Sequence, residues 1–318
     1  MKKLRIAILT GSGKTIVEPL LKNNVDIVGI SEVSSEYSGM HRFNKWMEDI
    51  YWNIIRRQKS PHLVKYANAE NIPYIEKNTI TEINYKKWLK SLDLDLLILH
   101  HCPILPHDLF SIPKFGAINI HPALLPKYRG PNPFFWLYYN LDMTAGVTLH
   151  FVDSNVDTGN IINQRHLDIE IGNSALEIEA ELYRTCVASM LIEAISHLES
   201  KGKINTVLQP KESPTVYAKR VSDDEYYELV SNPNLTIEHF WHTLNSNDQW
   251  RKVFLSKIKY HKLYNWSLCR YERKHMNEPY YSVRNDVDGV YIPHVAGAIY
   301  LKRKFCYKKL IKALLKHS

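Results

Sequence analysis

Short apolar runs alternate with helix-like segments through the first half of the chain, and this alternation limits the folds that the chain can adopt. The runs have the length and apolar composition of buried strands. They cover Leu4–Leu9, Val25–Ile30, Leu94–Leu99, Ala117–Ile120 and Val147–Val152. Strands that alternate with helices favour an α/β fold in which a mainly parallel sheet carries helices on both faces. We therefore predict a Rossmann-like arrangement for this half.

Helical spacing of apolar residues marks several segments outside the runs. It is found in Ile16–Lys22, in Met40–Arg57 and in the long segment Ser174–Leu198. The character of the chain changes near Pro210, and Lys211–Pro214 has the composition of a linker. Because 318 residues exceed the roughly 150 of a typical domain, we expect two domains, at residues 1–210 and 211–318.

The C-terminal part is predicted to form a smaller domain that contains strands. A helix is expected at Ile237–Leu244, and two short strands at Gly289–Pro293 and Ala298–Leu301, joined by a turn around Gly297. The last segment, Tyr307–Lys316, places leucines among lysines at helical spacing. It is either a basic amphipathic helix at a membrane surface or, more commonly, a helix packed on its domain with solvated lysines.

Positive charge is concentrated in the C-terminal third. The net charge is +8, and the segments 251–262 and 302–318 contain basic residues but no acidic ones. Such a pattern favours a phosphorylated or polyanionic partner, such as a nucleotide, an RNA or an anionic lipid surface. A solvated basic face that only aids solubility explains the pattern equally well.

The cysteines and the apolar runs indicate where the chain resides. The four cysteines are scattered and form no CxxC pair, so we expect free thiols in a reducing cytoplasm and no structural zinc site. No apolar run approaches the ~20 residues of a membrane span. The basic N-terminus leads into an apolar run that is too short for a signal peptide, and a first strand is expected there.

Two polar residues, Asn119 and His121, stand at the end of the predicted strand Ala117–Ile120. Residues two apart in an extended segment point to the same face. Pro122 ends the strand, so both side chains lie where open α/β sheets usually place their chemistry. With the carboxylate of Asp157 further along the chain, they form a set of groups that can serve acyl transfer.

A glycine-containing loop, Gly11-Ser12-Gly13-Lys14-Thr15, follows the first predicted strand and ends like a phosphate-binding P-loop. The P-loop pattern needs a further glycine five residues before the second one, and that position is Ile8. The match therefore fails. The glycines either form a tight turn or let backbone amides approach an anionic group at the following helix.

Three separated blocks give the chain a resemblance to the folate-dependent formyltransferases. This family includes methionyl-tRNA, glycinamide ribonucleotide and sugar N-formyltransferases. The blocks, in the family's order, are Asn119-Ile120-His121-Pro122-Ala123-Leu124-Leu125-Pro126-Lys127-Tyr128-Arg129-Gly130, Gly146-Val147-Thr148-Leu149-His150-Phe151-Val152 and Val156-Asp157-Thr158-Gly159-Asn160-Ile161-Ile162. The resemblance covers residues 1–210, as a formyltransferase catalytic domain. It implies that Asn119, His121 and Asp157 are catalytic, that the formyl donor is 10-formyltetrahydrofolate, and that no metal is needed.

The resemblance also implies binding residues. The folate pocket is expected to be lined by His101, Cys102, Pro103, Ile104, Leu105, Asp153 and Val156. Contacts with the acceptor are expected from Gly11, Ser12, Gly13, Lys127, Tyr128 and Arg129. The remaining histidines nearby, His100, His107 and His150, are expected to be packing, surface or strand residues.

The chemistry of formyl transfer explains the residue types of the trio. Negative charge develops on the formyl oxygen when an amine attacks, and Asn119 and a protonated His121 can donate hydrogen bonds to it. A histidine near its reference pKa of ~6.5 can also move the proton that the amine loses. Asp157 either takes that proton through a water or raises the pKa of His121.

The acceptor remains open between several primary amines. The favoured acceptor is an amino sugar linked to a nucleotide, with methionyl-tRNA as the alternative. For the tRNA enzyme we would expect a Gly-Thr-Pro-like turn and a small-residue Ala-Ala-Pro, where this chain has Gly11-Ser12-Gly13 and Pro131-Asn132-Pro133. The basic C-terminal third and the basic insertion Met40–Pro61 favour tRNA or a pyrophosphate. Glycinamide ribonucleotide, hydrolysis of the formyl donor and non-catalytic nucleic-acid binding are weaker alternatives. The C-terminal domain could bind the acceptor or form a homodimer.

Overall fold

The computed structural model of the protein describes residues 3–11, 15–33, 63–77, 80–256, 258, 261–274, 283–286, 289–306 and 309. The chain forms two compact units. The first comprises Met1–Arg129, Gly146–His166 and Ala180–Val216, and the second comprises Gly130–Ala145, Leu167–Glu179 and Tyr217–Ser318. Two internal segments thus group with the C-terminal part, and the division into domains 1–210 and 211–318 stays a prediction.

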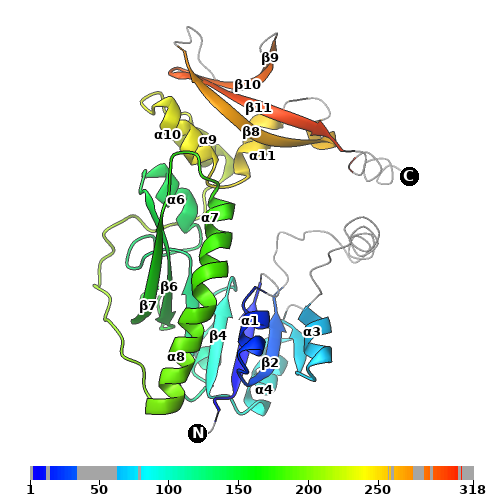
Figure 1. Ribbon diagram of the computed structural model, residues 1–318, viewed down its shortest axis with the longest axis vertical. Helices are drawn as coiled ribbons and strands as arrows, with labels where there is room; N and C mark the ends of the chain where they lie inside the picture. Colours follow the sequence, from blue (N-terminus) through cyan, green and yellow to red (C-terminus); the bar gives the residue numbers. More distant parts are fainter. Residues whose placement is uncertain are drawn as a thin grey trace. The chain divides into compact units, whose positions relative to one another are not determined.

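A seven-stranded, mostly parallel sheet organises the first unit (Figure 1). Its strands are β1 (Ile6–Thr10), β2 (Ile27–Glu32), β3 (Tyr74–Glu76), β4 (Leu96–His100), β5 (Ala117–His121), β6 (Thr144–Phe151) and β7 (Ile161–Asp168), in the order β3-β2-β1-β4-β5-β6-β7. The pairs from β3 to β5 are parallel, and β6 runs antiparallel to β5. The predicted Rossmann-like α/β class is confirmed.

Helices connect the strands of this unit. They are α1 (Val17–Lys22), α3 (Leu63–Ala69), α4 (Glu82–Ser91), α5 (His107–Phe110) and α8 (Ala188–Lys201). The long helix predicted at Ser174–Leu198 is confirmed: α7 (Ala175–Leu182) continues through a π-helical turn (Tyr183–Val187) into α8 without a break. The predicted helix Met40–Arg57 lies outside the described residues.

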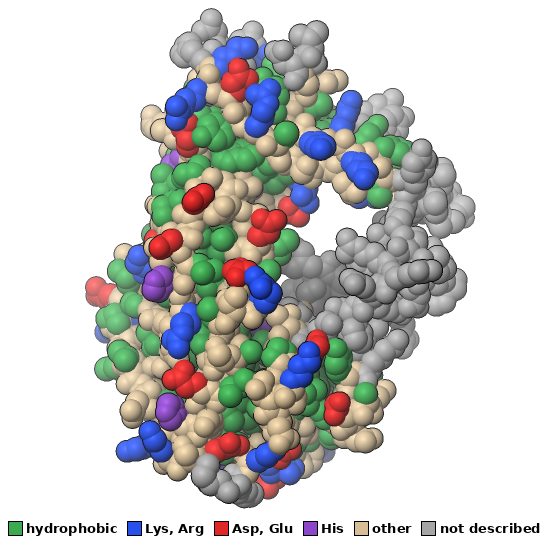
Figure 2. Space-filling view, viewed as in Figure 1, with side chains coloured by type: hydrophobic (Ala, Val, Ile, Leu, Met, Phe, Trp, Pro, Cys, Tyr) green, Lys and Arg blue, Asp and Glu red, His purple; other side chains and the backbone are tan. Residues whose placement is uncertain are grey.

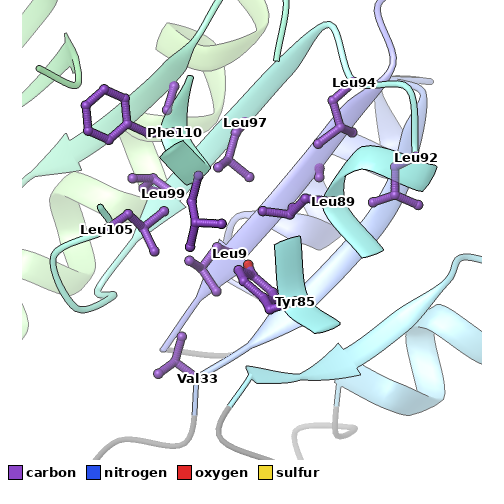
Figure 3. Close-up of a cluster of buried hydrophobic side chains, with 13 residues drawn as sticks. Leu9, Val33, Tyr85, Leu89, Leu92, Leu94, Leu97, Leu99, Leu105 and Phe110 are labelled. Carbon is purple, nitrogen blue, oxygen red and sulfur yellow. The ribbon is translucent and has the colours of Figure 1, made fainter. Parts of the chain in front are cut away.

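The core of the first unit explains why the strands are continuously apolar. Figure 3 shows Leu9 of β1 and Leu97 and Leu99 of β4 gathered with Tyr85 and Leu89 of α4 on one side of the sheet. Alternate residues of the same strands point to the opposite face, and they too are almost completely buried. A parallel sheet whose two faces are both covered selects apolar side chains at every position.

The second unit combines helices with a four-stranded antiparallel sheet. The helices are α6 (Pro133–Tyr139), α9 (Asp223–Val230), α10 (Ile237–Leu244), α11 (Gln249–Leu255) and the short 3-10 turn His261–Leu263. The strands are β8 (Tyr264–Arg273), β9 (Arg284–Asp286), β10 (Gly289–His294) and β11 (Gly297–Phe305), in the order β8-β11-β10-β9. The predicted helix and the predicted hairpin at Gly297 are confirmed. The predicted helix Tyr307–Lys316 lies almost wholly outside the described residues.

Candidate active site

Strand β5 presents Asn119 and His121 on one face, at its C-terminal end. His121 is the last strand residue, because Pro122 has no backbone N–H with which to continue the ladder. The antiparallel neighbour β6 pairs His150 with Asn119 and Thr148 with His121. The register of two strands therefore brings a second histidine to the candidate site.

The loop after β6 folds back so that Asp157 reaches the same place. Oδ1 of Asp153 accepts hydrogen bonds from the backbone N–H of Asn155 (3.1 Å) and from Oγ1 of Thr158 (2.7 Å), which fixes the turn. Asp157 has a left-handed backbone with φ of 55°. A side chain at Gly159 would place Cβ 1.8 Å from the carbonyl oxygen of Phe151, so this position tolerates only glycine.

The amide, the imidazole and the carboxylate meet in this part of the first unit. Nδ2 of Asn119 donates to Oδ1 of Asp157 at 3.3 Å, and Nδ1 of His121 lies 3.5 Å from Oδ2 of the same carboxylate. The His121 and Asp157 side chains are only 5% and 11% exposed. Three groups that are up to 38 positions apart in the sequence thus form one cluster with little exposure to solvent.

Backbone carbonyls fix the protons of both histidines, because a carbonyl oxygen can only accept. Nε2 of His121 lies 3.0 Å from the carbonyl oxygen of Tyr128, so Nε2 carries the proton and Nδ1 of the neutral ring is the basic nitrogen. Nδ1 of His150 donates to the carbonyl oxygen of Phe151 at 2.8 Å. Nε2 of neutral His150 can then accept from Nδ2 of Asn119 at 3.2 Å.

Sequence reasoning missed His150. It does lie on a strand, as predicted, but it also contacts Asn119 and lies 3.5 Å from Oδ1 of Asp157. The only signal for it was its place in the strand block Gly146–Val152. That signal was insufficient, because the position opposite Asn119 depends on the antiparallel register of β6, which the sequence does not show.

Burial sets the protonation state of His121. Removal from water disfavours the imidazolium and lowers the pKa of His121, and the nearby Asp157 carboxylate opposes this effect without overcoming it. His150 and His101 lower the pKa a little further. The resting site therefore holds a neutral histidine whose Nδ1 faces a carboxylate, rather than the protonated ring that was one expectation from the sequence.

The loop after β4 holds the residues predicted to line the folate pocket. His101 has a left-handed backbone with φ of 49°, and its Nε2 lies 3.1 Å from the hydroxyl of Tyr183. Ile104 is 79% exposed, whereas Leu105 is buried in the core. Burial raises the pKa of the Cys102 thiol to about 12, so this cysteine is not a nucleophile. Pro103 and Asp153 are exposed and Val156 is half-buried.

The residues predicted to contact the acceptor differ in their surroundings. The backbone N–H of Gly11 donates to the carbonyl of His100, and a Cβ at this glycine would lie 2.2 Å from the carbonyl oxygen of His101. Ser12 and Gly13 lie outside the described residues, and Lys127 is exposed. Tyr128 and Arg129 are buried. The guanidinium of Arg129 donates to Gln209, Pro210 and Lys211, so its first role is structural, and contact with an acceptor stays a prediction.

The described part of the chain shows neither a metal cluster nor a membrane-spanning helix. No group of three or more His, Cys, Asp and Glu side chains there has the arrangement of a metal site. The helices within the described ranges include none that could cross a membrane.

Comparison with known proteins identifies the class. The family model described as formyl transferase matches residues 4–195, which is more than half of the chain. The chain therefore belongs to the formyl transferase family, as its sequence blocks predicted.

Named relatives extend this result. The chain is 32% identical over 168 residues to a methionyl-tRNA formyltransferase of Thermodesulfovibrio yellowstonii, covering 52% of this chain and 53% of the relative. It is 29% identical over 189 residues to the bifunctional polymyxin resistance protein ArnA of Wigglesworthia glossinidia brevipalpis, covering 59% of this chain and 27% of that one. The chain thus spans about half or less of the length of these two relatives.

Solved structures match nearly the whole chain. WlaRD, a sugar 3N-formyl transferase crystallised with dTDP and 5-N-formyl-THF, has a TM-score of 0.58 at 18% identity, covering 96% of this chain and 98% of that one. An N-formyltransferase from Helicobacter canadensis, in complex with folinic acid and dTDP-3-aminofucose, has a TM-score of 0.57 at 18% identity, covering 95% and 100%. At this identity the likeness establishes a shared fold.

Proposed function

We propose that the protein transfers a formyl group from 10-formyltetrahydrofolate to a primary amine. The observation that carries the proposal is the meeting of Asn119, His121 and Asp157 in one buried cluster. In the transfer, the amine nitrogen bonds to the formyl carbon, the bond from that carbon to the folate nitrogen breaks, and one proton passes from the amine to the folate nitrogen.

The cluster contains a suitable group for each part of this reaction. Nδ1 of His121 is the basic ring nitrogen and lies 3.5 Å from Oδ2 of Asp157, so an amine beside this pair can donate to both atoms. After taking the proton, the imidazolium is stabilised by Asp157 and can return the proton to the leaving nitrogen. The Asn119 amide supplies a donor for the charge that develops on the formyl oxygen.

Asn119 must release one hydrogen bond to serve as that donor. Both hydrogens of Nδ2 have partners in the structure, Asp157 and His150. To donate to the formyl oxygen, one of these two N–H groups must leave its present acceptor. His150, whose Nε2 lies 3.2 Å from Nδ2 of Asn119, helps to hold the amide in place.

The surroundings of the cluster fit a folate donor. The pteridine is flat and carries several hydrogen-bonding groups, and such ligands bind where apolar side chains and a few polar groups converge. The loop from His101 to Leu105 exposes the apolar side chain of Ile104. The loop lies near enough that Asp157, as a minor contribution after burial, raises the pKa of Cys102.

We favour the amino group of a nucleotide-linked sugar as the acceptor. Two crystallised formyltransferases that share the fold over almost the entire chain, WlaRD and the enzyme from Helicobacter canadensis, are a sugar 3N-formyl transferase bound with dTDP and an N-formyltransferase bound with dTDP-3-aminofucose. The sequence after Arg129-Gly130, with its paired prolines and aromatics, also departs from the small residues expected of the tRNA enzyme.

Methionyl-tRNA is the alternative acceptor, and one observation favours it. The relative from Thermodesulfovibrio yellowstonii is a methionyl-tRNA formyltransferase. Figure 2 shows Lys and Arg side chains exposed at the surface, and β8 and β11 carry several exposed basic residues. They support tRNA less strongly, because some of them already have partners nearby. Arg273 pairs with Glu238, Arg270 pairs with Glu272, and the Arg303 guanidinium lies 5.4 Å from the ring of Tyr264.

A panel of acceptors separates these candidates. Formyl transfer from 10-formyltetrahydrofolate is measured with dTDP- and UDP-linked amino sugars, methionyl-tRNA, glycinamide ribonucleotide and no amine. We expect turnover with an amino sugar and weak turnover with tRNA. Turnover with charged tRNA that falls steeply as salt increases would assign the tRNA reaction instead. Formate release that is unchanged by every amine would indicate a hydrolase and contradict the proposal.

His121 is expected to titrate below its reference pKa of 6.5, because burial outweighs the Asp157 carboxylate. It therefore stays neutral, and competent as a base, at pH 6.5 and above. Histidine-selective NMR measures the midpoint, with the His121→Ala variant assigning the signal. The decrease of kcat/KM at acidic pH should then reflect protonation of the acceptor amine, and its midpoint should shift with the pKa of that amine. A His121 midpoint above 6.5 would contradict this assignment of the base.

A further inference from the structure

Residues Gln209–Thr215, here called the strap, contact the two segments that support the candidate site, namely the Asp157 loop and the backbone of Tyr128. Gln209 contacts the loop that carries Asp157. Thr215 lies at the other end, where its Oγ1 accepts from the backbone N–H of Tyr128 at 2.7 Å. The carbonyl of the same Tyr128 accepts from Nε2 of His121. One segment therefore touches the supports of both the imidazole and the carboxylate.

The side-chain amide of Gln209 is fully used. Its Nε2 donates to the carbonyl oxygens of Asp157 (3.0 Å) and Gly159 (2.7 Å). Its Oε1 accepts from Nε (3.2 Å) and Nη2 (2.9 Å) of Arg129. An amide has two hydrogens to donate and two lone pairs, so all four positions have partners. The residue is only 6% exposed.

Arg129 fixes which way this amide points. A guanidinium only donates, so it selects Oε1 and turns Nε2 toward the Asp157 loop. Arg129 is itself held by the carbonyls of Pro210 (2.7 Å) and Lys211 (3.1 Å) within the strap. The strap, Arg129 and the Asp157 loop therefore form a closed network of hydrogen bonds that excludes other orientations of the Gln209 amide.

The Asp157 loop has a conformation that benefits from such a clamp. Asp157 adopts φ of 55°, a region that residues other than glycine seldom occupy, and Gly159 lies against the carbonyl of Phe151. Gln209 donates one hydrogen bond to the carbonyl on each side of Thr158, and these two bonds oppose relaxation of the turn. They hold the carboxylate close to Nδ1 of His121.

We propose that Gln209 is a positioning residue for the transfer reaction, and that it acts by clamping the Asp157 loop in register with His121. The inference rests on the proposed function, since it assumes that Asp157 serves catalysis. It assigns Gln209, and the Arg129 that orients it, a role that the sequence did not indicate.

The Gln209→Glu variant tests the clamp with little change in size. The carboxylate still accepts from Arg129, so the strap stays attached, but it places an oxygen against the carbonyls of Asp157 and Gly159. We expect kcat to fall by about 10²-fold, as a displaced reacting group allows, with the KM for the formyl donor nearly unchanged. Gln209→Met removes the donors without adding charge, and it also removes the acceptor of Arg129, so kcat should fall at least as far.

Gln249→Glu is the matched control. Nε2 of Gln249 donates to the carbonyls of Val221 and Ser222 at 3.1 Å each and to Oδ1 of Asp223 at 3.3 Å. The same substitution again removes the donors to two backbone carbonyls, and also sets a carboxylate against Asp223, but in the second unit. It should lower the melting temperature as Gln209→Glu does and leave kcat close to the wild-type value. Equal kcat for the Gln209 variants and the control would overturn the proposal.

A titration keeps the clamp testable apart from turnover. Asp157 raises the pKa of His121, so a displaced loop should move the NMR midpoint of His121 to lower pH in Gln209→Met, which adds no charge, and not in the control. If the wild-type protein formylates no amine, the proposed function fails while this titration still reports the clamp. An unmoved midpoint in a folded Gln209→Met variant would exclude it.

Discussion

His121→Ala is expected to lower kcat for formyl transfer by about 10²–10⁴-fold, the range for loss of a positioned acid–base group. The substitution removes Nδ1, which lies 3.5 Å from Oδ2 of Asp157. It is the nitrogen of the His121 ring that is not hydrogen-bonded to a backbone carbonyl. Binding of the formyl donor should change far less, because the ring lies at the reacting atoms. Steady-state kinetics with the acceptor identified by the panel, beside a thermal melt, provides the measurement.

His166→Ala is the control for this prediction. His166 is exposed on β7, in the same sheet, and replacing it should leave kcat unchanged. If folded His121→Ala protein turned over as fast as this control, the ring could not be the base. If only the KM increased, the ring would contribute to binding and not to the proton transfer assigned to it.

Asn119→Ala should cost about 10²–10³-fold in kcat, the range for loss of one donor to a developing oxyanion. The interaction forms only as charge develops, so kcat and kcat/KM should decrease together. Asn119→Asp is a stricter variant. It keeps the size, removes both N–H donors and places a second carboxylate beside Asp157.

The control here is Asn163→Ala on β7, whose amide donates to Glu193 at the surface. It should retain wild-type turnover. Asn119→Asp should be at least as inactive as Asn119→Ala. Substantial activity in Asn119→Ala would show that no donor is needed at this position, and would leave His121 and Asp157 to act without an oxyanion site.

Much of the first unit could be predicted because its strands are buried on both faces. Strands β4 and β1 are apolar at each position up to their last residues, His100 and Thr10, and this pattern identifies them. Strand β3 has three residues, all half-buried, and β7 contains Asn163, Gln164 and Arg165 among its eight. Neither has a continuous apolar run or a clean alternation, so both were missed.

The candidate site was only partly predictable, because some of its residues meet through strand register and turns that leave no local sequence pattern. Asn119 and His121 share a face because of the two-residue period of a strand, which the sequence shows directly. Asp157 was reached through the family blocks, and its approach depends on a left-handed turn. His150 and Gln209 come from strand register and from hydrogen bonds across 52 positions, and neither leaves a local pattern.

The central claim is that one amide, one imidazole and one carboxylate carry formyl transfer to an amine. The most direct test is a single-turnover experiment with carbon-13 in the formyl group of 10-formyltetrahydrofolate, a dTDP-linked amino sugar and excess enzyme, followed by NMR. The account predicts a formamide signal on the acceptor with the wild-type protein, and none above background with the Asn119→Ala, His121→Ala and Asp157→Ala variants. Labelled formamide formed at the wild-type rate by any two of these folded variants would contradict it.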